Sequence, residues 1–283
     1  DLSMAVLARS MLHAENAYYI PDVAIHGRVC FTNLPPNTAF RGFGGPQGMA
    51  ALESAIHEIA HSLGIDALEV QQRNLYGVGR RNVTPYGQTV QRNHLPEIVD
   101  TLAQSCDYAQ RRHEILAANQ SDPLWLRGIA MSPVKFGISF TTTFLNQASA
   151  LVNVYTDGTV QVSTGATEMG QGVNTKIRQL VADEFGIDWP DVIPMPTSSE
   201  KSANTSPTAA SAGTDLNGAA AVNACQKIRR RLALLAAQRF AAGDPSLPES
   251  PDDVHFVDGQ VFDQRQPERR MSFAELCQAA RLA

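Results

Sequence analysis

TAFRGFGGPQ, at residues 38–47, constrains the fold of this chain more than any other stretch. Its glycines accept positive φ angles and let another group approach the bare backbone. Pro46 suits the first turn of a helix, and Gly64 is placed to end that helix. Between them, apolar residues recur at helical spacing, at Leu52, Ile56, Ile59 and Leu63. We therefore expect a tight turn that leads directly into a helix.

Three further segments share this richness in small residues, namely KFGISFT at 135–141, GATEMGQG at 165–172 and SPTAASAGTD at 206–215. Backbone amides in such turns bind anions, above all in front of a helix. One such segment alone is typical of an ordinary helix start. Four of them in one chain predict a large ligand that carries phosphate.

Hairpins and helices without regular alternation predict an α+β fold, with mixed sheets flanked by helices. Asp157-Gly158 and Asp258-Gly259 each separate two short strand patterns, which predicts two hairpins. Asp66 is a predicted N-cap. The expected helices cover residues 2–16, 46–63, 67–75, 95–104, 108–118, 173–185, 216–240 and 272–283. The expected strands cover residues 127–131, 148–155, 159–163, 192–196, 254–257 and 260–262.

The segment 77–91 is typical of a linker because it combines glycines, Pro85 and paired arginines. We place the domain boundary there, between residues 1–90 and 91–283. The chain begins with Asp1 and stops within a predicted helix. Both ends predict an internal piece of a longer protein.

Composition excludes several classes of protein. A net charge of −5 and 43% hydrophobic residues fit a folded domain with no basic face for nucleic acid or a membrane surface. No apolar run approaches the ~20 residues that span a bilayer. The four cysteines are scattered, which predicts reduced thiols, a cytoplasmic location and no iron–sulfur cluster within this chain.

HEIAH at residues 57–61 matches the H-E-x-x-H pattern of zinc hydrolases. On a helix, this spacing places His57 and His61 on one face with Glu58 as a base. A catalytic zinc also needs a third protein ligand, and residues 62–68 contain no histidine. We prefer two ordinary histidines and keep a zinc hydrolase as an alternative.

The four small-residue segments together resemble the molybdenum-cofactor-binding large subunit of the molybdenum hydroxylase (xanthine oxidase) family, and most closely its xanthine dehydrogenase branch. The resemblance extends from the first predicted helix to the long helix at 216–240 and weakens after residue 241. It implies parts of two molybdopterin-binding domains, divided at the 77–91 linker. It also implies a molybdopterin cofactor, often a cytosine dinucleotide form in bacteria, and hydroxylation of purines with oxygen from water, in purine catabolism. The [2Fe–2S] clusters, FAD and NAD would belong to other subunits or domains of the same enzyme.

The resemblance also implies roles for individual residues. No side chain of this chain would ligate the molybdenum. The expected cofactor contacts are Arg41, Met169, Gly170, Gln171, Ala210, Ser211, Ala212, Gly213 and Thr214. Ala212 and Gly213 stand where the animal enzymes hold valine and serine, so one hydroxyl contact would be lost.

For substrate, Phe43 and Phe140 match two rings that enclose a planar purine, and Thr141 would hydrogen-bond beside Phe140. Leu2 and Leu145 match apolar positions that line the substrate channel. Arg9 is the expected catalytic residue. It matches an arginine that pairs with the purine oxygen and stabilises negative charge, and aldehyde-type members lack it.

The chain departs from the family pattern in two ways. An upstream glycine-phenylalanine-glycine loop with a substrate-binding glutamate is absent, and so is the downstream catalytic glutamate. We therefore expect this piece alone to be inactive and free of molybdenum. An aldehyde- or N-heterocycle-oxidising relative and a purely structural role remain alternatives.

Overall fold

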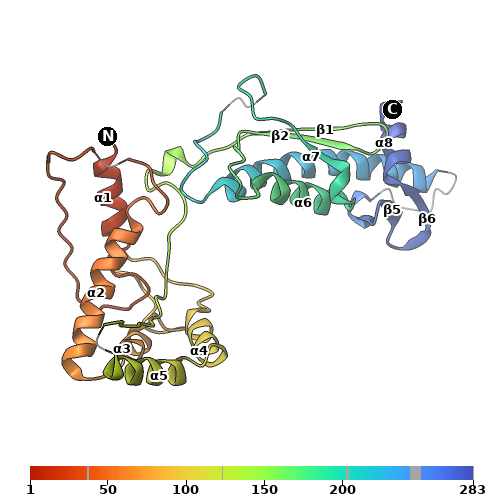
Figure 1. The fold of residues 1–283 in the computed structure, drawn as a ribbon. Helices are drawn as coiled ribbons and strands as arrows, with labels where there is room; N and C mark the ends of the chain where they lie inside the picture. The colour runs from red at the N-terminus through yellow and green to blue at the C-terminus, as the bar shows by residue number, and fades with distance from the viewer. Residues whose placement is uncertain (37, 123, 202–203, 243–249, 283) are drawn as a thin grey trace. The chain divides into compact units, whose positions relative to one another are not determined.

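The computed structural model describes residues 1–36, 38–122, 124–201, 204–242 and 250–282. The chain divides into two compact units, Asp1–Gly137 and Ile138–Ala283. Figure 1 colours the first unit from red to yellow-green and the second from green to blue. Each unit has its own hydrophobic core.

The first unit is helical. Its helices are α1 (Ser3–Met11), α2 (Gly45–Leu63), α3 (Ala67–Asn74), α4 (Leu95–Ser105) and α5 (Tyr108–Ser121). Ile56 and Ala60 of α2 share a core with Leu68 of α3, Val99 of α4 and Tyr108 of α5. The predicted helix ends are confirmed where the signals are local: Gly64 adopts a left-handed conformation after α2, and the Asp66 side chain accepts a hydrogen bond from Leu68 N at 2.8 Å.

The glycines of the 38–47 stretch and its continuation allow α1 and α2 to pack backbone to backbone. A Cβ atom on Gly44 would lie 2.0 Å from Val6 O, and one on Gly48 would lie 2.2 Å from Ser10 O. Gly45 instead makes room for the ring of Phe136, which a Cβ would meet at 2.6 Å. These three glycines therefore serve packing within the first unit, whereas we expected Gly44 and Gly45 to present amides to a ligand.

Residues 127–131 do not form a strand, so that prediction is wrong. Side chains take the hydrogen bonds that a neighbouring strand would have taken. Arg127 N donates to Asn119 Oδ1 at 2.9 Å, and Arg127 O accepts from Asn119 Nδ2 at 2.9 Å. Further along, Met131 O accepts from Gln71 Nε2 at 2.9 Å and Pro133 O accepts from Asn16 Nδ2 at 2.8 Å. The segment is extended but fastened to helices and turns.

The second unit is α+β, as expected. Its first sheet has the order β1 (Ala150–Val154), β2 (Val160–Thr164), β3 (Val192–Pro194), in which β1 and β2 are antiparallel and β2 and β3 are parallel. Helices α6 (Val173–Phe185) and α7 (Gly213–Ala241) run alongside this sheet in Figure 1. Val162, Ile177, Ala221 and Phe185 belong to their common core.

A second sheet is an antiparallel meander of β4 (Val254–Val257), β5 (Gln260–Asp263) and β6 (Gln266–Ser272), and it is followed by α8 (Phe273–Arg281). Both hairpins predicted from Asp-Gly turns are present. The sequence interpretation missed β6. Short 3₁₀ turns lie at Thr143–Leu145, Trp189–Asp191 and Pro251–Asp253.

The change from one compact unit to the other falls at Gly137 and not within residues 77–91. The physical reason is that Val99 and Tyr108, which follow the 77–91 segment, pack into the same core as α2 and α3. The assignment of residues 1–90 and 91–283 to two cofactor-binding domains stays a prediction.

Candidate functional site

Three of the four small-residue segments meet within the second unit. Ser139 N donates to Ala210 O at 2.8 Å, and Thr167 N donates to Thr208 Oγ1 at 2.9 Å. Gly165 packs so closely on Thr205 that a Cβ atom would lie 2.2 Å from its Cγ2. The loops 138–147, 165–172 and 204–212 therefore form one cluster, which we call the three-loop cluster.

The first loop of this cluster is folded around Asn146. Phe140 N donates to Asn146 Oδ1 at 2.8 Å, and Asn146 Nδ2 donates to Phe140 O at 2.9 Å. The reciprocal pair fixes the backbone at Phe140. Phe140 and Leu145 are half-buried, and Thr141 is exposed. The sequence analysis did not single out Asn146.

The second loop is closed by Glu168, a residue that the sequence analysis did not single out. Its carboxylate accepts hydrogen bonds from the amides of Gly170 at 2.9 Å, Gly172 at 3.0 Å and Asn174 at 3.0 Å. These bonds, led by that from Asn174, hold the pKa of Glu168 below its usual value. The amides in front of α6, expected to bind an anionic ligand, thus hold a carboxylate of the chain itself. A carboxylate five residues before the first residue of a helix, in a glycine-rich turn, would have been the signal for it.

Gln171 in the same loop also makes local contacts. Its Oε1 accepts from Met169 N at 2.6 Å, and its Nε2 donates to Thr167 O at 2.9 Å. Met169, Gly170 and Gln171 are exposed, with 66% of Met169 accessible. The loop is therefore ordered by its own side chains and presents these three residues to solvent.

The third loop leads into α7 through a strained turn. Ala210 and Ser211 have φ angles of 56° and 55°, in the left-handed region that side chains rarely adopt. Ala212, which precedes α7, has no side-chain oxygen or nitrogen that could cap the helix. Gly213 and Thr214 begin the helix and are half-buried. The two helix starts in the cluster therefore differ: Glu168 accepts hydrogen bonds from the amides at the start of α6, whereas no side chain caps the start of α7.

The first unit carries the remaining predicted site residues. Arg41 is exposed, and Phe43 is half-buried with a φ angle of 48°, which is strained for an aromatic residue. The turn between them closes through Phe43 N, which donates to Phe40 O at 2.8 Å. Leu2 is 41% exposed at the start of α1.

Arg9, the expected catalytic residue, is 5% exposed on α1. Its Nη1 donates to Gly137 O, and its guanidinium lies over the Phe136 ring at 5.6 Å from the centroid. Burial lowers the pKa of Arg9, although a guanidinium stays charged in proteins. A buried, oriented guanidinium of this kind suits recognition of an oxygen that carries negative charge.

The zinc alternative gains no support from the structure. His57 and His61 are both exposed on α2. Across the described ranges, no three His, Cys, Asp or Glu side chains gather in a way that could hold a metal ion. Among the described residues, no helix combines the length and the apolar character needed to cross a membrane.

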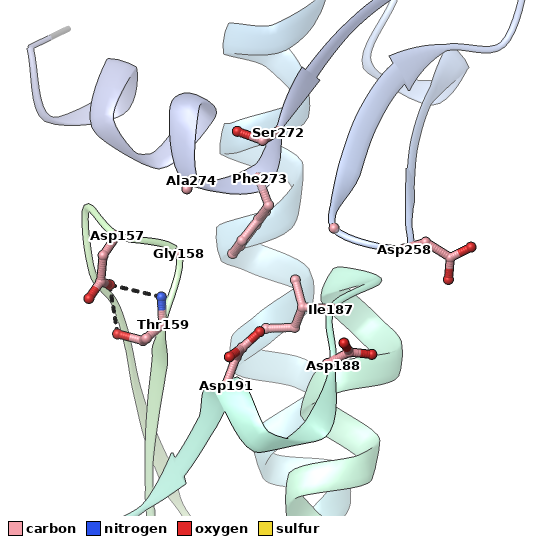
Figure 2. Close-up of a pocket in the computed structure, with 11 residues that line it drawn as sticks. Asp157, Gly158, Thr159, Ile187, Asp188, Asp191, Asp258, Ser272, Phe273 and Ala274 are labelled. Carbon is pink, nitrogen blue, oxygen red and sulfur yellow. Dashed lines mark hydrogen bonds between the residues drawn. The ribbon is translucent and has the colours of Figure 1, made fainter.

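A pocket in the second unit is lined by none of the predicted site residues. It has a volume of about 460 Å³, and its lining includes Asp157, Asp188, Asp191, Asp258 and Phe273 (Figure 2). Asp157 in it accepts hydrogen bonds from Thr159 N at 2.9 Å and Thr159 Oγ1 at 2.7 Å. It opens at the Asp157-Gly158 turn, whereas the three-loop cluster begins at the opposite end of β2.

Comparison with known proteins agrees with the resemblance drawn from the sequence. Two family models, each described as a molybdopterin cofactor-binding domain, match residues 1–75 and 101–283. The chain is 48% identical over 232 residues to a xanthine dehydrogenase of Oryza sativa subsp. japonica, and 49% identical over 234 residues to the nicotinate hydroxylase hnxS of Emericella nidulans. Each alignment covers 82% of this chain and 17% of the relative, so the chain spans about a sixth of the length of these proteins.

Solved structures show the same fold at lower identity. Quinoline 2-oxidoreductase from Pseudomonas putida 86 matches with a TM-score of 0.75 and 22% identity, over 99% of this chain and 35% of that one. An aldehyde oxidoreductase from Desulfovibrio desulfuricans matches with a TM-score of 0.69 and 22% identity, over 82% of this chain and 25% of that one. The chain belongs to the molybdopterin cofactor-binding domain family.

Proposed function

We propose that this chain supplies part of the cofactor and substrate site of a molybdenum hydroxylase that oxidises purines such as hypoxanthine and xanthine to urate. The observation that carries the proposal is the three-loop cluster, in which three segments distant in sequence are hydrogen-bonded into one surface. The family membership supports the choice of a pterin as the ligand.

The residues present fit such a group. Two consecutive left-handed residues, Ala210 and Ser211, turn the backbone in front of an uncapped helix, and amides in that arrangement attract an anionic group. Met169, Gly170 and Gln171 are exposed beside them on the second loop. We infer that the phosphate-bearing part of the cofactor binds at the start of α7, because Glu168 occupies the start of α6. Arg41 would bind the cofactor through the planar donors of its guanidinium.

The bound cofactor supplies the redox chemistry and the oxygen atom that comes from water. Residues of this chain bind and orient the substrate. Phe43 and Phe140 offer flat apolar surfaces for a heterocycle, and Thr141 offers a hydroxyl beside Phe140. Leu2 and Leu145 would line the approach. Arg9 would hydrogen-bond a purine oxygen and stabilise negative charge as it develops there.

Electrons would leave through iron–sulfur and flavin parts of the same enzyme, to NAD. We propose a cytoplasmic location, which agrees with the four free cysteines of this chain. We expect the 283-residue chain alone to bind no molybdenum and to turn over no purine. Metal analysis and a urate assay on the purified chain check this.

A second candidate is oxidation of another nitrogen heterocycle. The nicotinate hydroxylase matches this chain at 49% identity, as closely as the xanthine dehydrogenase at 48%. A substrate that carries a carboxylate would also be recognised by the guanidinium of Arg9.

The test is Arg9→Met in the complete enzyme that contains this chain, with xanthine, nicotinate and a neutral aromatic aldehyde as substrates. We expect kcat/KM for xanthine to fall by about 10²–10³-fold, as for loss of one donor to a developing oxyanion, and that for the aldehyde to change little. Arg111→Met, at an exposed position on α5, is the matched control. Equal losses for all substrates would refute the purine assignment, and a selective loss for nicotinate would favour the second candidate.

A further inference from the structure

His13 closes a ring of hydrogen bonds around Arg9. Arg9 O lies at the end of α1, where carbonyls lose their helical partners, because His13 N donates to Ser10 O at 3.2 Å instead. The His13 ring takes the place of the missing helical donor, because its Nδ1 lies 2.8 Å from Arg9 O. Its other nitrogen, Nε2, accepts from Gly137 N at 2.9 Å. Gly137 O in turn accepts from the guanidinium of Arg9.

This ring of bonds fixes the protonation state of His13. A carbonyl oxygen only accepts, so Nδ1 must carry a proton. An amide N–H only donates, so Nε2 must present its lone pair. His13 is therefore a neutral imidazole in the Nδ1–H form, and both nitrogens are used.

The surroundings of His13 favour the same form. The side chain is buried, at 4% exposed, and its ring centroid lies 4.7 Å from that of Phe136. Burial is the main cause that lowers the pKa of His13, and the charges of Arg9 and Lys135 act in the same direction. The bond to Arg9 O and the nearby Glu15 oppose this shift. Glu15 is itself paired with Lys135, whose Nζ lies 2.6 Å from Glu15 Oε1.

We propose that His13 is a positioning residue, which as a neutral imidazole fastens Gly137 to α1 and thereby holds the guanidinium of Arg9 and the ring of Phe136 in place. The consequence for substrate rests on the proposed function of Arg9. The fastening itself rests only on contacts within the first unit.

The pH dependence follows from the bonds. Protonation of Nε2 removes the acceptor that Gly137 N uses and adds a positive charge beside Arg9 and Lys135. Because the pKa is lower in the folded chain, the contribution of His13 to stability is complete above its ordinary pKa of about 6.5. It is lost as the pH falls toward the lowered, folded value.

The first test measures the tautomer in the unmodified chain. Nitrogen NMR of ¹⁵N-histidine-labelled protein separates protonated from bare ring nitrogens, and the His13 signals are those missing from His13→Gln. We expect a protonated Nδ1 and a bare Nε2 at pH 7, and titration below pH 6.5. An Nε2–H tautomer, or a charged ring at pH 7, would overturn the proposal.

The second test compares His13→Gln with His13→Leu. A glutamine amide keeps one donor and one acceptor and has no titrating proton, whereas leucine keeps neither. The readout is hydrogen exchange of peptides that contain Gly137, corrected for the intrinsic exchange rates. In the wild type, protection of these peptides should fall as the pH is lowered. In His13→Gln protection should not fall with acid in this way, and in His13→Leu it should be lost at every pH. His57→Gln, at an exposed histidine of α2, should match the wild type.

In the complete enzyme, His13→Leu should lower kcat/KM for the purine by about tenfold to a hundredfold, and His13→Gln should restore most of it. Equal Gly137 protection in all variants would refute the fastening. Should the fastening hold while Arg9→Met shows no selectivity among substrates, the proposed function fails and the positioning role of His13 stands.

Discussion

Gly48→Ala tests whether the glycines after residue 43 serve helix packing. Helix propensity alone predicts a gain, since alanine in a helix interior is favoured over glycine by about 1 kcal/mol. The structure predicts the opposite sign, because the new Cβ would lie 2.2 Å from Ser10 O and 3.1 Å from Ser10 C. Both obstacles are backbone atoms of α1, which no rotamer change can move.

The magnitude follows from the distance. Ordinary contact begins at 3.4 Å, so α1 and α2 must separate by roughly 1 Å. Overpacking costs about 1–3 kcal/mol, and a contact that only a backbone shift can relieve belongs in the upper part of this range, at about 2–3 kcal/mol. After the gain in propensity is subtracted, we expect a net loss of about 1–2 kcal/mol in the local stability of α1 and α2, which is about a tenfold rise in their opening constant.

Hydrogen exchange of the α1 and α2 amides measures this loss directly and does not require two-state unfolding of the whole chain. Gly218→Ala is the matched control. It is also in a helix interior, on α7, but the atoms near its Cβ would be side-chain atoms: Cδ1 of Leu180 at 2.6 Å, the tip of a flexible side chain, and Cγ2 of Thr214 at 3.8 Å. Protection of α1 and α2 that is unchanged or increased in Gly48→Ala would refute the packing argument.

Further predictions concern the second loop of the cluster and the cysteines. Glu168→Gln should speed exchange of the Gly172 and Asn174 amides, because the carboxylate that they bind loses its charge. In the wild type the same loosening should appear only as the pH falls below the ordinary range of a glutamate toward the lowered pKa of Glu168, and a loop indifferent to both changes would contradict its role. Burial raises the pKa of the Cys225 thiol to about 12, so iodoacetamide at pH 8 should label exposed Cys30 and spare Cys225 until the chain unfolds. If Cys225 and Cys30 were labelled at the same rate in the native chain, the claim that Cys225 is buried would be refuted.

Local signals made much of the second unit predictable. The Asp157-Gly158 and Asp258-Gly259 turns have sequence preferences of their own, and the hairpins they predict are present. The bounds predicted for α6, residues 173–185, are those observed, because glycines stand at both ends. Where structure depends on distant partners, prediction failed. Strand β6 is polar and is held by its pairing with β5, and residues 127–131 have a strand-like pattern but no strand beside them.

The glycine-rich segments show why site prediction was less complete. A missing Cβ is equally needed for a ligand to approach and for two helices to pack, so sequence alone does not separate Gly44 and Gly48 from Gly170. The structure separates them, since a Cβ at Gly170 would meet nothing within 4 Å whereas those at Gly44 and Gly48 would clash with α1. The roles of Glu168 and His13 depend on which amides and carbonyls lie near them in space, and residue type does not reveal that.

The central proposal is that the three-loop cluster binds the pterin and that Arg9 recognises the purine substrate. An experimental structure of the complete enzyme with cofactor and a purine bound tests it most directly. We expect Gln171, Ser211 and Arg41 in contact with the pterin, Arg9 in contact with the purine oxygen, and Phe43 and Phe140 in contact with the purine ring. A cofactor bound away from the three-loop cluster, or a purine out of reach of Arg9, would contradict the account.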